Sequence, residues 1–155
     1  MKKIGAGIAI LAAFFMLGCV GSHAKTFTMS MDEVLKDSEV NITGQSYYSG
    51  FKTLDAGDIL IIKDKILNMT YSIKYNATMI LFSSNSSQGL FFAGNITNKF
   101  HDGEDVKIKL HIIEDKFEYN YQGQTWNIDI EFYREAWDIT NHTGKYLPVS
   151  VITSA

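Results

Sequence analysis

Side chains able to bind a metal or to carry out acid–base chemistry gather in one short segment. His101, Asp102, Glu104 and Asp105 place four potential ligands within five residues. Hard cations such as Ca²⁺ prefer oxygen ligands, but a calcium loop needs more of them at a defined spacing. No paired metal-ligand spacing links the four histidines, and catalytic motifs such as Gly-x-Ser-x-Gly or His-Glu-x-x-His are absent. We interpret the segment as a solvated turn, and expect no metal, no cofactor and no enzymatic activity.

The only cysteine, Cys19, follows a leader typical of exported proteins. Lys2 and Lys3 precede an apolar run over residues 4–17, in the order of a secretory signal. This run is too short to span a bilayer, which takes roughly 20 helical residues. Met-Leu-Gly-Cys at 16–19 resembles the lipobox of prokaryotic lipoproteins, whose cysteine carries lipid and begins the mature chain. The resemblance implies a cleaved signal peptide over residues 1–18 and a lipid anchor on Cys19.

Two other fates of the leader remain open. The sequence Ser-His-Ala at 22–24 fits the small-x-small rule of ordinary signal peptidase, which would release a secreted chain beginning at Lys25. Alternatively, the leader stays uncleaved as an N-terminal anchor. All three outcomes predict export, and the lipoprotein form predicts a position on the outer face of the cytoplasmic membrane.

Asparagines occur in glycosylation sequons more often than chance explains. Six of the nine asparagines precede x-Ser or x-Thr, which predicts N-glycosylation in an exported domain. A polar, turn-rich composition without glycans is the alternative, because Asn, Ser and Thr also form turns. A lipobox together with abundant sequons points to an archaeal source. The predicted acceptors are Asn41, Asn68, Asn76, Asn85, Asn95 and Asn141.

Strands dominate the pattern beyond the leader. Ser30 and Glu33 have the spacing of a capping box, which predicts a short helix over Met31 to Asp37. Alternation of apolar and polar residues predicts strands at 59–67, 78–82, 90–93, 106–112 and 126–132, and a protruding hairpin that extends the fourth strand through 115–121. Residues 19–56 are expected to be a tether, the short helix and an irregular lead-in, and residues 135–155 a C-terminal tail.

Charges on the last two predicted strands suggest how these strands pair. Trp126, Ile128, Ile130 and Phe132 would form the core face of the final strand. Lys107 and Lys109 on the preceding strand would then lie opposite the acidic residues Asp129 and Glu131.

Five strands in this order favour a small closed barrel, because closure removes exposed sheet edges. Gly-Asp-Ile-Leu-Ile-Ile at 57–62, Gly-Leu-Phe-Phe-Ala-Gly-Asn at 89–95 and Gly-Glu-Asp-Val-Lys-Ile at 103–108 resemble the OB-fold of archaeal exported hypothetical proteins. The resemblance covers residues 57–134 and implies an all-β, five-stranded OB-like barrel. The helix usual between strands three and four would shrink to 97–100. A small open β-sandwich is the alternative.

Aromatic residues on these strands are the candidate ligand contacts. OB-folds bind oligonucleotides or sugars on the face of strands two and three. The predicted contacts are Phe82 and Phe91 on these strands, and Tyr71 and Tyr75 on an expected continuation of the first strand. Filling the core is the alternative use of such rings.

The net charge of the chain without its leader bears on which class of partner it could bind. Without Lys2 and Lys3 the chain has 12 basic and 17 acidic residues, a net charge of −5, which disfavours nucleic acid. We expect a non-enzymatic, membrane-anchored module that binds an unidentified extracellular protein or small ligand. The alternative is an exported protein for single-stranded nucleic acid, whose only basic cluster would be Lys63, Lys65, Lys107 and Lys109.

Overall fold

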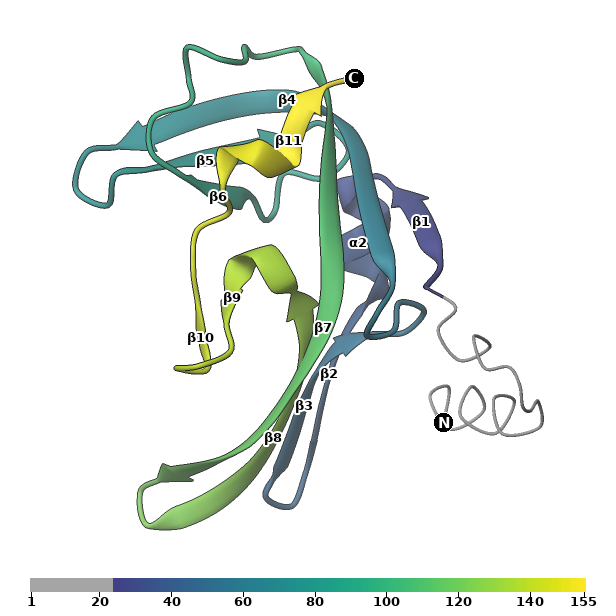
Figure 1. The fold of residues 1–155 in the computed structure, drawn as a ribbon, viewed down its shortest axis with the longest axis vertical. Helices are drawn as coiled ribbons and strands as arrows, with labels where there is room; N and C mark the ends of the chain where they lie inside the picture. Colours follow the sequence, from purple (N-terminus) through teal and green to yellow (C-terminus); the bar gives the residue numbers. More distant parts are fainter. Residues whose placement is uncertain (1–23) are drawn as a thin grey trace.

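The computed structural model describes residues 24–155, which form an all-β domain with one α-helix (Figure 1). The signal peptide predicted at 1–18 and the anchor predicted at Cys19 lie outside these residues. Within 24–155, no helix is long and apolar enough to cross a membrane. The elements are β1 (Thr26–Met29), α2 (Met31–Asp37), β2 (Ser38–Thr43), β3 (Ser46–Phe51), β4 (Ile59–Ser72), β5 (Ala77–Phe82), β6 (Leu90–Ala93), β7 (Asp105–Tyr121), β8 (Gln124–Tyr133), η2 (Arg134–Ala136), β9 (Trp137–Asp138), β10 (Thr143–Gly144), η3 (Val149–Val151) and β11 (Ile152–Ser154).

Helix α2 confirms the short helix predicted over Met31–Asp37, and Ser30 is its N-cap. The Ser30 side chain accepts a hydrogen bond of 3.2 Å from the backbone N–H of Glu33, which satisfies one of the free donors at the helix start. The helix buries Met31 and Val34 against the sheet.

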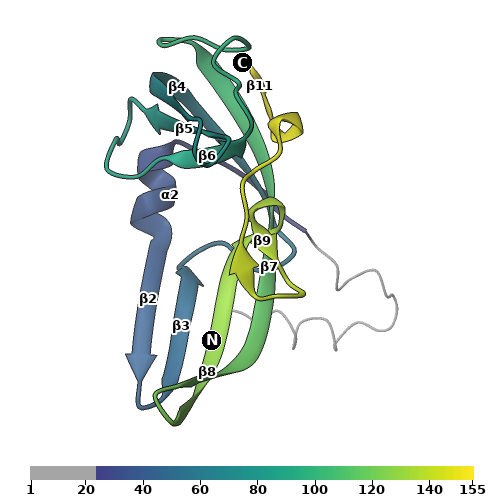
Figure 2. The same ribbon diagram turned by 90° about the vertical axis from the view of Figure 1, so that its left-hand side faces the viewer.

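One long strand, β7, joins the two halves of the molecule (Figures 1 and 2). The sheet order is β2-β3-β8-β7-β4-β5-β6, with β1 added in parallel to β4 and β11 antiparallel to β7. The first half of β7, Asp105–His111, pairs with Ile59–Lys65 of β4, and the second half, Ile112–Tyr121, pairs with β8. Both halves are antiparallel.

The core lies inside the half formed by β4, β5, β6 and the start of β7. Its fully buried side chains include Leu60, Ile62, Phe82, Phe92 and Ile108. Residues 135–155, expected to be a tail, pack onto the sheet: the β9–β10 segment contacts Asp115 of β7, and the residues after it pack onto the half that holds the core. Leu147 exchanges backbone hydrogen bonds with β6, and β11 pairs with β7.

The closed barrel predicted from the strand order is wrong, although the all-β class is confirmed. Strand β8 pairs with the far half of β7 and, on its other side, with β3. It therefore never reaches β6, the strand it would have to meet to close a barrel over residues 57–134, and the sheet stays open.

The irregular lead-in predicted before residue 57 is also wrong, because residues 38–51 form the hairpin of β2 and β3. Gly44 makes its turn with φ of +59°, a conformation that glycine adopts without strain. Strand β3 pairs in parallel with β8. Its Ser and Tyr residues show little apolar alternation, so this tertiary pairing decides the strand.

The predicted lysine-to-acid pairing between the last two strands fails for a related reason. Lys107 lies opposite Lys63, and Lys109 opposite Ile61, because this part of β7 pairs with β4. Only Lys116, further along β7, lies opposite Asp129. The supposed core face of β8 is half-buried, whereas Glu131 and Tyr133 on its other face are buried.

Candidate functional site

Strands β2, β3, β8 and residues 114–121 of β7 form a four-stranded region that we call the outer sheet. Its two hairpins, β2–β3 and β7–β8, extend to the same end of the molecule (Figures 1 and 2). Cross-strand register assigns its side chains to two faces. Asn41, Tyr48, Asp129 and Lys116 follow one another across one face, and Ile42, Tyr47, Ile128 and Phe117 across the other.

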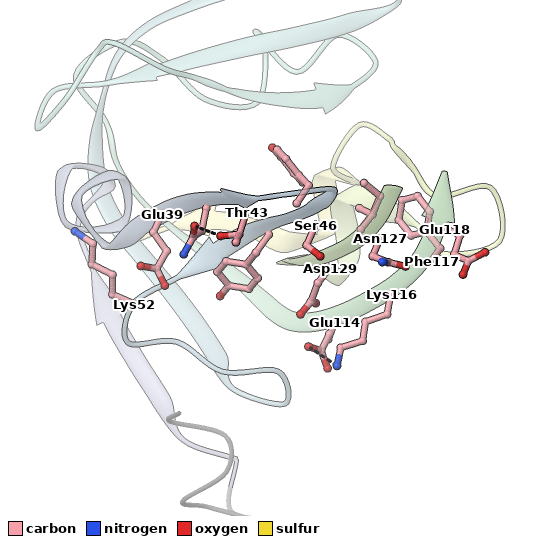
Figure 3. A pocket seen from close by; sticks show the side chains of 14 residues that line it. Glu39, Thr43, Ser46, Lys52, Glu114, Lys116, Phe117, Glu118, Asn127 and Asp129 are labelled. Atoms are coloured by element: carbon pink, nitrogen blue, oxygen red, sulfur yellow. Dashed lines mark hydrogen bonds and ion pairs between the residues drawn. The ribbon is translucent and has the colours of Figure 1, made fainter. Parts of the chain in front are cut away.

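The polar face contains a groove of about 1120 Å³, which we call the acidic groove (Figure 3). Four carboxylates line it against two lysines, so its formal charge is negative. Lys116 Nζ lies 3.9 Å from Glu114 Oε2, which is a weak ion pair. Glu118 is exposed, and Glu39 and Asp129 are half-buried. The charged lining residues are Glu39, Glu114, Glu118, Asp129, Lys52 and Lys116.

A buried carboxylate lies beneath the polar face of the outer sheet. Glu131 is 1% exposed, and the Tyr48 hydroxyl donates a hydrogen bond of 2.6 Å to its Oε1. Burial and the neighbouring Glu131 raise the pKa of Tyr48 far above its ordinary value. A Cβ at Gly50 would lie 2.3 Å from the Tyr48 hydroxyl, so a larger residue there would displace this hydrogen bond.

The opposite face of the outer sheet is apolar and aromatic. Val40 and Ile42 are 61% and 60% exposed, and Tyr119 and Tyr121 lie exposed near the β7–β8 turn. The only carboxylate on this face, Asp115, is buried under the β9–β10 segment. It accepts hydrogen bonds from Trp137 Nε1 at 2.8 Å and contacts His142 Nδ1 at 2.6 Å.

Strand β2 is a free edge of the sheet. The backbone N–H of Lys52 donates to the carbonyl of Asp37 at 2.7 Å, so positions 37 and 52 form a hydrogen-bonded pair. In an antiparallel ladder such pairs alternate. The backbone N–H and C=O groups of Val40 and Ile42 therefore point outward, away from β3 and toward solvent.

The predicted aromatic contacts are not brought together in one site. Phe82 is fully buried in the core, which contradicts its assignment as a ligand contact. Tyr71 donates to Asn76 Oδ1 at 2.8 Å, and Tyr75 lies exposed beside Lys74. A sequence pattern places all four on strands but cannot tell a core ring from a surface ring.

Phe91 alone lines a concavity. It borders a second, apolar groove of about 630 Å³ with Tyr146, at 6.5 Å between ring centroids. This groove lies between β6 and the C-terminal segment.

Most sequon asparagines are exposed, and the side-chain N–H groups of two of them donate to carboxylates, that of Asn141 to Asp138 Oδ2 at 2.9 Å. Asn85 is half-buried, and its side-chain N–H donates to Asp32 Oδ1 at 3.0 Å. Asn41 lines the acidic groove, so a glycan there would lie within it. The other acceptors, Asn68, Asn76, Asn95 and Asn141, are exposed, and glycosylation stays a prediction for all six.

The loop at 101–105 holds the C-terminus in place. Glu104 accepts a hydrogen bond from the Ser154 hydroxyl of β11 and another, of 3.1 Å, from the His101 backbone N–H. His111 and Glu135 form a separate pair at 2.6 Å. In the part of the chain that the structure describes, no three acidic, His or Cys side chains gather as metal ligands.

The sequence contained a signal for the groove that the prediction missed. Val40 and Ile42 alternate with Glu39, Asn41 and Thr43, which is the period of a half-buried strand. Three glycines, Gly44, Gly50 and Gly57, among polar and aromatic residues led instead to the interpretation of an irregular lead-in.

No family model, no curated protein and no solved structure matches the chain. Its functional interpretation therefore depends on the acidic groove, the β2 edge and the distribution of charge over the two halves of the domain.

Proposed function

We propose that this chain is a non-enzymatic cell-surface lipoprotein whose β domain binds an extended segment of a partner protein. The segment would add to the outer sheet as a new strand beside β2. The leader favours a position at the membrane, held by lipid on Cys19. The acidic groove and the free edge of β2 beside it are the surface proposed to bind the partner.

We further propose an OB-like ancestry for the half that contains the core. Strands β4, β5 and β6 form a meander, and β7 returns antiparallel to β4. The C-terminal segment bridges β6 in parallel through Leu147 and pairs with β7 through β11. In this proposal the C-terminal segment takes the place of the fifth OB strand, and the β7–β8 hairpin is an extension grown between strands four and five.

The observation that supports strand addition is the free edge between two chemically different faces. Outward N–H and C=O groups on Val40 and Ile42 offer main-chain hydrogen bonds, the usual source of affinity in this binding mode. Side chains of an added strand would alternate between the two faces. Those on one side would pack on Val40 and Ile42, and those on the other would lie beside Glu39 and the acidic groove. The matching partner alternates apolar and basic residues.

Calorimetric titration with synthetic peptides tests this function. A peptide alternating Lys and Val should bind, and one alternating Glu and Val should not, because the groove repels acids. Ile42→Pro should weaken binding at least about tenfold, since proline removes an outward donor yet is tolerated at an edge position. Asn68→Ala, on β4 in the other half, is the matched control. Equal binding of both peptides, or unchanged binding by Ile42→Pro, would reject strand addition.

The anchor has its own test. Mass spectrometry of the N-terminal peptide from the native membrane fraction should show lipid on Cys19. An unmodified N-terminus at Lys25 would reject the lipoprotein while leaving the binding proposal intact.

A further inference from the structure

Four lysines share one exposed surface at the opposite end of β7 from the acidic groove. Lys63 and Lys65 lie on β4, and Lys107 and Lys109 on β7. All four are exposed, whereas the residues between them, such as Ile62 and Ile108, are fully buried. The lysines therefore lie together on the outer face of this sheet, away from the core. We call this surface the lysine stripe.

The stripe concentrates positive charge on an acidic protein. Lys63 and Lys107 are directly opposite each other, an arrangement that costs stability because like charges repel across a strand pair. One acid interrupts the stripe: Asp105 pairs with Lys65 at 3.1 Å. Neighbouring positions on β1 and β11 are neutral, being Thr28 and Thr153. With a net charge of −3 for the whole chain, this segregation favours an anionic partner at this surface.

The start of the domain lies beside the stripe. Strand β1 pairs with Ile59–Ile62 of β4, directly before Lys63, with Thr28 opposite Ile61 (Figure 1). Thr26, its first residue, is seven positions after Cys19. Seven residues reach at most about 25 Å even when fully extended. A lipid on Cys19 would therefore keep this end of the domain close to the membrane.

We propose that the lysine stripe docks on anionic lipid headgroups of the membrane that holds the N-terminal anchor. This inference rests on the proposed export and anchoring. Each basic residue near an anionic surface adds to binding, and a single lipid alone holds weakly. Single-stranded nucleic acid fits less well, because the stripe carries no aromatic ring on which bases could stack.

Docking in this way leaves the proposed binding site uncovered. Lys107 and Phe117 are ten residues apart on β7, which corresponds to about 30 Å along a strand. With the stripe against headgroups, the outer sheet and its free β2 edge therefore lie well beyond the docked lysines along β7, where a partner can reach them.

Lysine footprinting on the full, membrane-inserted protein tests the proposal. The protein is reconstituted in vesicles of equimolar phosphatidylglycerol and phosphatidylcholine, or of phosphatidylcholine alone, and exposed lysines are acylated and quantified by mass spectrometry. Acylation of the stripe lysines should fall several-fold in the anionic vesicles only, and recover at high salt. Lys74, Lys99 and Lys145, exposed outside the stripe, should react equally in both.

A charge-matched pair of variants separates a local from a general effect. K63Q/K107Q/K109Q should abolish the lipid-dependent protection of Lys65, and K74Q/K99Q/K145Q should preserve it. Equal stripe reactivity in both vesicles, or loss of protection in both variants, would overturn the proposal. So would an oligonucleotide that protects the stripe better than the anionic vesicles do.

The failure of this proposal can be distinguished from the failure of the proposed anchor. The mass of the N-terminal peptide reports on lipid at Cys19, whereas the footprint reports on the stripe whichever form of the leader holds the protein.

Discussion

Raising the pH above 10 should destabilise the domain through Tyr133, the last residue of β8. Tyr133 is 6% exposed and packs against Phe51 and Phe132, with ring centroids 6.0 and 4.6 Å away. Burial raises the pKa of Tyr133 far above its ordinary value of 10.0. The folded protein therefore keeps a neutral phenol at a pH where the unfolded chain ionises it.

Linkage gives the size and sign of this effect. A group that is neutral when folded and ionised when unfolded lowers the free energy of unfolding by about 1.4 kcal/mol for each pH unit above its unfolded pKa. The contribution of Tyr133 to the free energy of unfolding is thus fully present below pH 10. It is lost as the pH rises toward the pKa of Tyr133 in the folded protein. Tyr48 acts in the same direction but more weakly, because solvent partly screens it.

Urea unfolding followed by tryptophan fluorescence, repeated at several pH values between about 8 and 11, measures the slope. Tyr133→Phe keeps the ring, removes the titration, and should flatten the loss of stability above pH 10. Tyr75→Phe, at an exposed site, should leave the slope unchanged. The reasoning is refuted if wild type and Tyr133→Phe lose stability equally, or if all eight tyrosines ionise near pH 10 in the folded protein.

Three further predictions concern the packing of the core, the stability in acid and the role of the groove. Phe82→Ala should lower the free energy of unfolding by about 3–5 kcal/mol in urea titrations, because its buried ring leaves a cavity, whereas Phe91→Ala should cost less than about 1 kcal/mol. Burial alone would raise the pKa of Glu135, but hydrogen bonds from the His111 backbone and imidazole hold it below the ordinary 4.5. Its stabilisation is present above that value and lost as the pH falls, so Glu135→Gln should flatten an acid titration followed by circular dichroism. If Asn41 carries a glycan, Asn41→Gln should tighten binding of the Lys–Val peptide to the native protein. The same substitution should leave the peptide affinity of unglycosylated protein unchanged.

Each of these expectations has a contrary result. Equal losses for Phe82→Ala and Phe91→Ala would contradict the assignment of Phe82 to the core. An acid transition unaltered by Glu135→Gln would contradict its stabilising pair with His111. Peptide affinity that is insensitive to a glycan demonstrated on Asn41 would show that the groove does not take part in binding.

Much of the local structure was predictable because its determinants lie within a few residues. The Ser30–Glu33 capping box predicted α2 with its correct bounds, since cap hydrogen bonds join neighbours. Alternation located β4, β5, β6 and β7 and the protruding β7–β8 hairpin. The all-β class followed from the same pattern.

Pairing and burial depended on contacts distant in sequence. The register of Lys107 against Lys63, rather than Asp129, follows from where β7 leaves β4 and joins β8. No local pattern encodes that switch, so both the charge pairing and the closed barrel were predicted wrongly. Which face of β8 is buried likewise depends on the segments that pack against it. In this structure the face that carries Glu131 is buried at that position.

The sequence alone thus determined the composition of each strand, the helix cap and the leader that predicts export, because these properties are local. Only the tertiary structure decided that β2 ends the sheet, that an acidic groove faces one side of it, and that four separate lysines form a single stripe. The physical reason is that a surface is made by residues far apart in the chain, and strand register alone determines which of them become neighbours.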